Sequence, residues 1–117
     1  RGCYIYFAID DSFKRAQAVN AEVAIEYFDA AAGTLGLEYD GSDPSAPFAG
    51  AYTRSQTTVE LHGDRVWNTA RFGLRDGRFL NSQNRGADFR LVVSAPDFPL
   101  RSVELTDAGA SPKKGSQ

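Results

Sequence analysis

The 117-residue chain has very few of the residues that most often carry catalysis or bind metals. It contains one cysteine, Cys3, one histidine, His62, and no methionine. A single cysteine excludes an internal disulfide framework and a thiolate zinc cluster. A nucleophilic triad would have to use His62, which stands in a turn-like His-Gly-Asp sequence, and no serine or cysteine has the sequence context of a nucleophile. We therefore expect that this protein is not an enzyme.

The chain also has no large excess of basic or acidic residues and no long hydrophobic run. The 13 Lys and Arg residues nearly balance the 15 Asp and Glu residues, which gives a net charge of -2, whereas nucleic-acid-binding domains usually carry a basic face. No apolar run approaches the roughly 20 residues that a membrane-spanning helix requires. Neither nucleic acid nor membrane is expected as a partner. Because the chain does not begin with Met, we expect it to be part of a larger or processed protein.

Short segments rich in β-branched and aromatic residues dominate the pattern, and Gly, Pro and Asp separate them. Seven such segments are predicted as strands: residues 3–9, 22–28, 34–40, 57–61, 65–74, 88–93 and 100–105. This pattern predicts an all-β fold, an antiparallel β-sandwich or jelly roll with two sheets and about 7–9 strands. A closed barrel would show the same alternation and remains an alternative. A turn or a single helical turn is expected over residues 12–16.

Alternation with period two assigns a core face to several strands. The residues predicted to be buried are Val23, Ile25, Tyr27, Leu35, Leu37, Tyr39, Ala70, Phe72, Leu74, Phe89, Leu91 and Val93. Segment 3–9 is apolar on both faces and is predicted to be covered on both. Segments 22–28 and 34–40 are joined by about five turn residues, which predicts an antiparallel hairpin. We expect a single domain over residues 1–105, followed by a flexible linker or tail at 106–117.

Two long polar loops, at residues 41–50 and 75–87, flank a strand with an unusual outer face. Trp67, Thr69 and Arg71 alternate on that face, opposite the apolar positions. An aromatic ring can stack on a sugar while Arg and Asn bond its hydroxyls, so this set predicts a shallow carbohydrate-binding surface. The residues expected to form it are Trp67, Arg71, Tyr52, Asn81, Asn84 and Arg85, with Phe48 beside them. Two alternatives stay open: Trp67 as a core or edge-packing residue, and Arg71 as the partner of a neighbouring carboxylate.

A structural calcium ion is also left open, and no other cofactor is expected. Asp10 and Asp11 follow a predicted strand, and Glu104 lies on the last one. Calcium takes carboxylate and carbonyl oxygens, often from loops distant in sequence. No contiguous calcium loop is present, because the sequence around residues 40–43 lacks the remaining ligand spacing. The alternative is that these aspartates only cap turns.

Two stretches of the chain carry a resemblance to a known kind of domain. They read Trp67-x4-Phe72-x-Leu74-x-Asp76-x2-Phe79 and Asn84-x-Gly86-Ala87-Asp88-Phe89-Arg90-Leu91. The pattern resembles ancillary β-sandwich domains of bacterial carbohydrate-active enzymes, which are galactose-binding-like jelly rolls and carbohydrate-binding modules. Segments 4–13, 23–29 and 37–40 are similar to the first strands of the same domains. The run from Asp88 to Arg90 is expected to be a structural corner, with Phe89 in the core and Asp88 bonding a turn.

The resemblance, which covers residues 4–105, implies a function. It implies a non-catalytic carbohydrate-binding module of a larger secreted bacterial enzyme, which holds that enzyme near polysaccharide. Its partners would be a polysaccharide or oligosaccharide and the neighbouring catalytic domain of the same polypeptide. The alternative is a structural accessory domain that packs against the catalytic domain and binds no sugar, with the Trp67 face as the interdomain surface.

Overall fold

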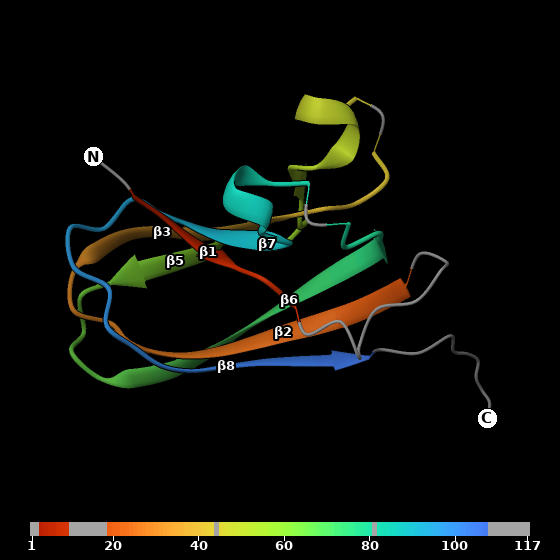
Figure 1. The fold of residues 1–117 in the computed structure, drawn as a ribbon. Helices are drawn as coiled ribbons and strands as arrows, with labels where there is room; N and C mark the ends of the chain where they lie inside the picture. The colour runs from red at the N-terminus through yellow and green to blue at the C-terminus, as the bar shows by residue number, and fades with distance from the viewer. Residues whose placement is uncertain (1–2, 10–18, 44, 81, 108–117) are drawn as a thin grey trace.

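The chain forms two antiparallel β-sheets that pack face to face as a β-sandwich (Figure 1). The computed structural model describes residues 3–9, 19–43, 45–80 and 82–107. The predicted all-β class and two-sheet sandwich are confirmed. The strands are β1 (Cys3–Phe7), β2 (Val19–Phe28), β3 (Ala32–Tyr39), β4 (Thr53–Arg54), β5 (Val59–His62), β6 (Trp67–Gly77), β7 (Phe89–Val93) and β8 (Leu100–Asp107). Two short 3-10 segments, η2 (Pro47–Gly50) and η3 (Asn84–Gly86), interrupt the loops, and no described helix is long and apolar enough to cross a membrane. The turn predicted at 12–16 and most of the predicted tail lie outside the described residues.

The five-stranded sheet has the order β1-β7-β3-β4, with β5 also paired to β3, and the three-stranded sheet has the order β6-β2-β8. The predicted hairpin between residues 22–28 and 34–40 is wrong. Strand β2 pairs with β6 and β8, whereas β3 pairs with β4, β5 and β7, so the short connection between them crosses from one sheet to the other. Alternation of apolar and polar residues shows only that each strand has one buried face. Two such strands can lie side by side in one sheet or face each other across the core, and the alternation is the same in both cases.

The core lies between the two sheets and contains every residue that alternation assigned to it. Phe72 on β6 and Leu91 on β7, for example, are fully buried. The prediction that segment 3–9 is covered on both faces is wrong, because Tyr4 is 54% exposed on the outer face of β1. An edge strand with Tyr4 and Tyr6 outside and Ile5 and Phe7 inside has the same composition as a doubly buried strand. The predicted corner is confirmed: Phe89 is buried, and Asp88 Oδ2 accepts the backbone N–H of Ile9 at 2.8 Å.

Side chains of the five-stranded sheet reach across to the backbone of β6. The Tyr39 hydroxyl donates to the carbonyl oxygen of Arg75 at 2.8 Å and accepts the Arg75 N–H at 3.0 Å. The Ser55 hydroxyl donates to the carbonyl oxygen of Gly73 at 2.8 Å. These bonds fix the edge of the three-stranded sheet to the β4 side of the other sheet.

Asp29 holds the crossing between the sheets. Its buried carboxylate accepts the backbone N–H groups of His62, at 3.1 Å, and Gly63, at 2.8 Å. Burial raises the pKa of this carboxyl, but the hydrogen bonds from His62 and Gly63 outweigh it, so the pKa of Asp29 lies below its usual value. The turn after β5 and the crossing after β2 are therefore tied together by an ionised carboxylate.

We expect Asp29→Asn to lower the free energy of unfolding by about 1 kcal/mol at pH 7, because an amide accepts these two bonds less well. A carboxyl with a lowered folded pKa contributes stability above its unfolded pKa of about 3.9 and loses it as the pH falls through the folded value. The difference between wild type and Asp29→Asn should therefore shrink below about pH 4. Urea unfolding at several pH values measures this difference, and a difference that stays constant down to pH 2 would contradict the assignment.

Candidate functional site

The structure divides the residues predicted for the sugar site between two faces. Trp67 and Arg71 lie on β6, on the outer face of the three-stranded sheet, whereas Tyr52 and Asn84 lie beside η2 and η3 at the five-stranded sheet. Asn81 and the side chain of Arg85 lie outside the described part of the chain. The four described side chains therefore do not form one site.

The Trp67 ring is exposed but already has neighbours. It is 41% exposed, and the Phe28 ring meets it edge-on with a centroid separation of 5.5 Å. The guanidinium carbon of Arg101 lies 4.1 Å from the Trp67 ring centroid, and Arg101 also pairs with Glu26 at 2.7 Å. Trp67 is thus not a core residue, and the Arg101 guanidinium already lies against its ring as a cation–π partner.

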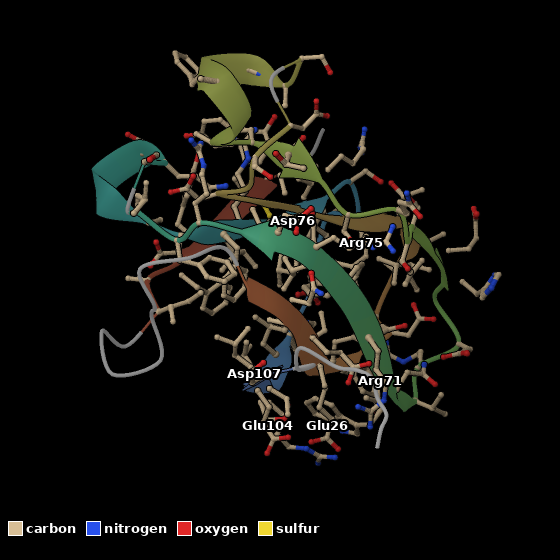
Figure 2. The ribbon with its side chains drawn as sticks, turned by 90° about the vertical axis from the view of Figure 1, so that its right-hand side faces the viewer. Glu26, Arg71, Arg75, Asp76, Glu104 and Asp107 are labelled. Atoms are coloured by element: carbon tan, nitrogen blue, oxygen red, sulfur yellow. The ribbon has the colours of Figure 1, made fainter. Side chains whose placement is uncertain are left out.

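Arg71 forms an ion pair with a carboxylate, which is the alternative role that the sequence left open for this residue. Its Nη1 lies 3.1 Å from Glu22 Oε1 on the neighbouring strand β2. Figure 2 shows Arg71, Glu26 and Glu104 together on the lower side of the view, along the outer face of this sheet. Exposed ion pairs of this kind contribute little to stability and leave the face well solvated.

A hollow of about 400 Å³ lies on the opposite side of the molecule, at the five-stranded sheet. In Figure 1 the two short coiled segments, η2 in yellow-green and η3 in cyan, stand above this sheet. The hollow is lined by residues of both segments and by Tyr6 of β1. We call it the tyrosine hollow. Its lining residues are Tyr6, Phe48, Tyr52, Ser82, Gln83 and Asn84.

Arg90 on β7 organises the tyrosines around this hollow. Its guanidinium carbon lies 3.9 Å from the ring centroid of Tyr4 and 4.1 Å from that of Tyr52. Its Nη1 donates to the Tyr6 hydroxyl at 2.8 Å, and its Nε donates to Glu38 Oε1 at 2.7 Å. One largely buried cation therefore lies between two aromatic rings and is held in its plane by two further partners.

A buried carboxylate fixes the loop that carries one wall of the hollow. Asp40, which is fully buried, accepts the backbone N–H of Leu80 at 2.7 Å and that of Ser82 at 3.1 Å. It also pairs with Arg78 Nη2 at 3.3 Å. The polar loop predicted at 75–87 is thus bound to the end of β3 and is not a free connection.

The two loops are also bonded to each other. Gln83 Nε2 donates to the carbonyl oxygens of Glu38, at 3.1 Å, and Ala51, at 2.7 Å, while the Asn84 N–H donates to the Tyr52 hydroxyl at 2.8 Å. Gln83 Oε1 is buried and accepts no hydrogen bond from the described residues. The walls of the hollow are therefore positioned before any ligand arrives.

Phe48 stands at the rim of the hollow in an unusual conformation. It is 80% exposed, and its backbone φ is +55°, followed by +57° at Ala49. Its ring meets that of Tyr52 edge-on at a centroid separation of 5.7 Å. Left-handed backbone at two consecutive non-glycine residues costs free energy, and such positions concentrate at functional sites.

The sequence analysis named Tyr52, Asn84 and Phe48, which lie at the tyrosine hollow, but did not name Tyr4, Tyr6 or Arg90. The signal was the i, i+2 spacing of Tyr4 and Tyr6, which places both on one face of a strand. Arg90 joins them only through strand pairing, since Tyr6 lies opposite Arg90 in the register of β1 with β7.

The calcium prediction stays untested. Asp10 and Asp11 lie outside the described residues, and Glu104 lies on β8. Among the described residues, no group of three or more His, Cys, Asp or Glu side chains is placed to hold a metal ion.

Comparisons of this chain with protein-family models, with curated proteins and with solved structures found no match. The resemblance to ancillary domains of carbohydrate-active enzymes therefore remains a prediction. A function must be argued from the geometry of the site.

Proposed function

We propose that this protein is a non-catalytic carbohydrate-binding domain and that the tyrosine hollow is its binding site. The observation that carries the proposal is the combination of aromatic rings and amides in one preformed hollow. Phe48 and Tyr52 offer apolar ring surface, and the exposed Ser82 and Asn84 offer hydroxyl and amide groups beside it. Sugar rings have apolar C–H faces and polar hydroxyl edges, which such a mixed lining can satisfy at the same time.

Two features favour binding over catalysis. The six described residues that line the hollow include no carboxylate, histidine or cysteine, so this part of the lining offers no acid–base pair or thiolate nucleophile. The hollow is open at its rim, where Phe48 is almost fully exposed, which suits a polymer that enters and leaves sideways. The domain would hold a larger secreted bacterial enzyme near polysaccharide by raising its effective concentration.

A structural accessory domain is the second candidate, and it is favoured by the opposite face. Val66 is 50% exposed and Trp67 is 41% exposed at the start of β6, so two large apolar side chains at consecutive positions reach the surface. Such neighbours suit contact with another domain of the same polypeptide. Under this alternative no glycan binds at either face.

We expect Phe48→Ala to weaken polysaccharide binding about tenfold, because removal of an aromatic contact costs about 1 kcal/mol or more. Phe48 is exposed, so this variant should stay folded. Affinity electrophoresis in gels containing xylan, β-glucan, pectin or alginate measures the retention, and titration calorimetry gives the affinity. Trp67→Ala is the matched control and should bind like wild type.

Two outcomes would overturn the proposal. Absence of retention on every glycan would favour the structural accessory domain. Loss of binding in Trp67→Ala, together with normal binding in Phe48→Ala, would place the sugar on the outer face of the three-stranded sheet.

A further inference from the structure

A second hollow, of about 560 Å³, lies on the other side of β4 from the tyrosine hollow. It lies between the segment around β4 and the edge of β6, and we call it the polar hollow. Its lining residues are Tyr39, Ser42, Asp43, Thr53, Arg54, Ser55, Gln56, Thr57, Gly73, Arg75 and Asp76. Unlike the tyrosine hollow, it has no exposed aromatic ring, since Tyr39 is buried.

Two arginines, Arg54 on β4 and Arg75 on β6, are among the residues that line the polar hollow, and both are exposed. Neither side chain has a hydrogen bond or ion pair to another residue in the described part of the chain. The arginines that do pair with carboxylates are Arg71, Arg78, Arg90 and Arg101. The hollow therefore brings together two cationic fork-shaped donors with free bonding capacity.

The two carboxylates of the hollow are not equivalent. Asp43 Oδ1 accepts the N–H and the hydroxyl of Ser45, at 2.9 and 2.7 Å, so this carboxylate is turned to its own loop. Asp76 is exposed, and its backbone N–H is held by Asn20 Oδ1 at 3.0 Å. In Figure 2, Arg75 and Asp76 lie near the end of β6, apart from Arg71, Glu26 and Glu104 on the lower side of the view. Asp76 can accept hydroxyls while the guanidiniums bind an anionic group.

The backbone leaves room for a ligand at Gly73. A Cβ atom built at this residue would meet no atom within 4 Å, and the residue is exposed. The hydroxyls on the inner side are already engaged: those of Tyr39 and Ser55 bond the β6 backbone, and Thr53 Oγ1 donates to the Gly50 carbonyl oxygen at 2.8 Å. The inner wall is thus rigid, and the free groups lie along the rim.

We propose that the polar hollow binds a carboxylate-bearing sugar unit, with Arg54 and Arg75 as the donors to its carboxylate. This inference deepens the proposed function by naming the class of polysaccharide as acidic. Tyr52 lines one hollow and the next residue, Thr53, lines the other, so the two hollows are adjacent across β4. One polysaccharide chain that occupied both would gain from the linkage of two weak contacts.

The test compares oligogalacturonate with its methyl ester, which keeps the sugar and removes the charge. We expect wild type to bind oligogalacturonate at least tenfold more tightly in titration calorimetry and to lose this preference at high salt. The double variant Arg54→Ala/Arg75→Ala should lose the preference. Arg71→Ala, which removes an arginine on the same strand but outside the hollow, should behave like wild type.

Three results would overturn this inference: equal affinity for the two probes, an unchanged preference in the double variant of a folded protein, or full competition by free acetate, which would mean a site for any small anion.

The outcome is separable from that of the proposed function. If Phe48→Ala alone abolishes binding of neutral glycans and the charge preference is absent, only the acidic-sugar inference fails. If oligogalacturonate binds through Arg54 and Arg75 but is indifferent to Phe48→Ala, only the tyrosine hollow fails.

Discussion

An Asp40→Ala variant is expected to lose about 3 kcal/mol or more of the free energy of unfolding. The change removes the acceptor of the Leu80 and Ser82 N–H groups and the partner of Arg78. Each buried donor left without an acceptor costs about 1–3 kcal/mol, and the cavity adds to this cost. Urea unfolding followed by the fluorescence of the single tryptophan measures the effect.

Asp43→Ala is the matched control for this experiment. Asp43 lies in the loop that follows β3 and is exposed, and its carboxylate bonds only Ser45 among the described residues, so its loss should change the free energy of unfolding little. Asp40→Asn keeps the shape and one acceptor oxygen and should fall between Asp40→Ala and wild type. A loss below about 1 kcal/mol for Asp40→Ala would mean that the loop over the tyrosine hollow does not depend on this carboxylate.

An Arg90→Met variant is expected to lose stability and glycan binding together. It leaves the largely buried Glu38 carboxylate without its ion partner, which typically costs about 3 kcal/mol or more. It also removes the cation between the Tyr4 and Tyr52 rings, so the tyrosine hollow loses its shape and binding should fall at least tenfold. Arg90→Lys should not restore binding, because an ammonium cannot lie flat between two rings and bond two partners in one plane.

A double variant separates the two effects of Arg90. In Arg90→Met/Glu38→Met the unpaired charge is removed, and stability should recover toward wild type, as apolar replacements of buried ion pairs often do. Glycan binding should stay weak, since the rings have lost the group that positions them. Arg101→Met is the control: its ion pair with Glu26 is exposed, and its loss should change the free energy of unfolding little. Recovery of binding in the double variant would show that Arg90 matters only for stability.

The strands and their buried faces follow from the sequence because alternation is a local property. Each residue predicted for the core needs only its own strand to be half-buried. Strand pairing is different, because it depends on which two apolar faces meet. The crossing at Asp29 illustrates this, since its buried carboxylate bonds a turn more than 30 residues away and so directs β3 into the other sheet.

The candidate site divides in the same way. Tyr52 and Asn84 were predictable from aromatic and amide residues in long loops, and the structure bonds them to each other. Arg90 was not predictable, because the residues next to it in the sequence indicate a structural corner. Its contact partners come from three other segments of the chain. Trp67 attracted attention as the only tryptophan, and its contact with Arg101 depends on β8 lying next to β2. These contacts depend on which strands pair and in which register, and the local sequence does not determine either.

The hydroxyls of Tyr39 and Ser55 have a consequence for how copies of this protein behave toward one another. An edge strand normally offers a row of free N–H and C=O groups that can template strand addition and aggregation. At the end of β6 the carbonyl oxygen of Gly73 and both backbone groups of Arg75 are already bonded by these side chains. A strand from another molecule would have to displace both hydroxyls before it could pair there, so this stretch of the edge resists edge-to-edge polymerisation.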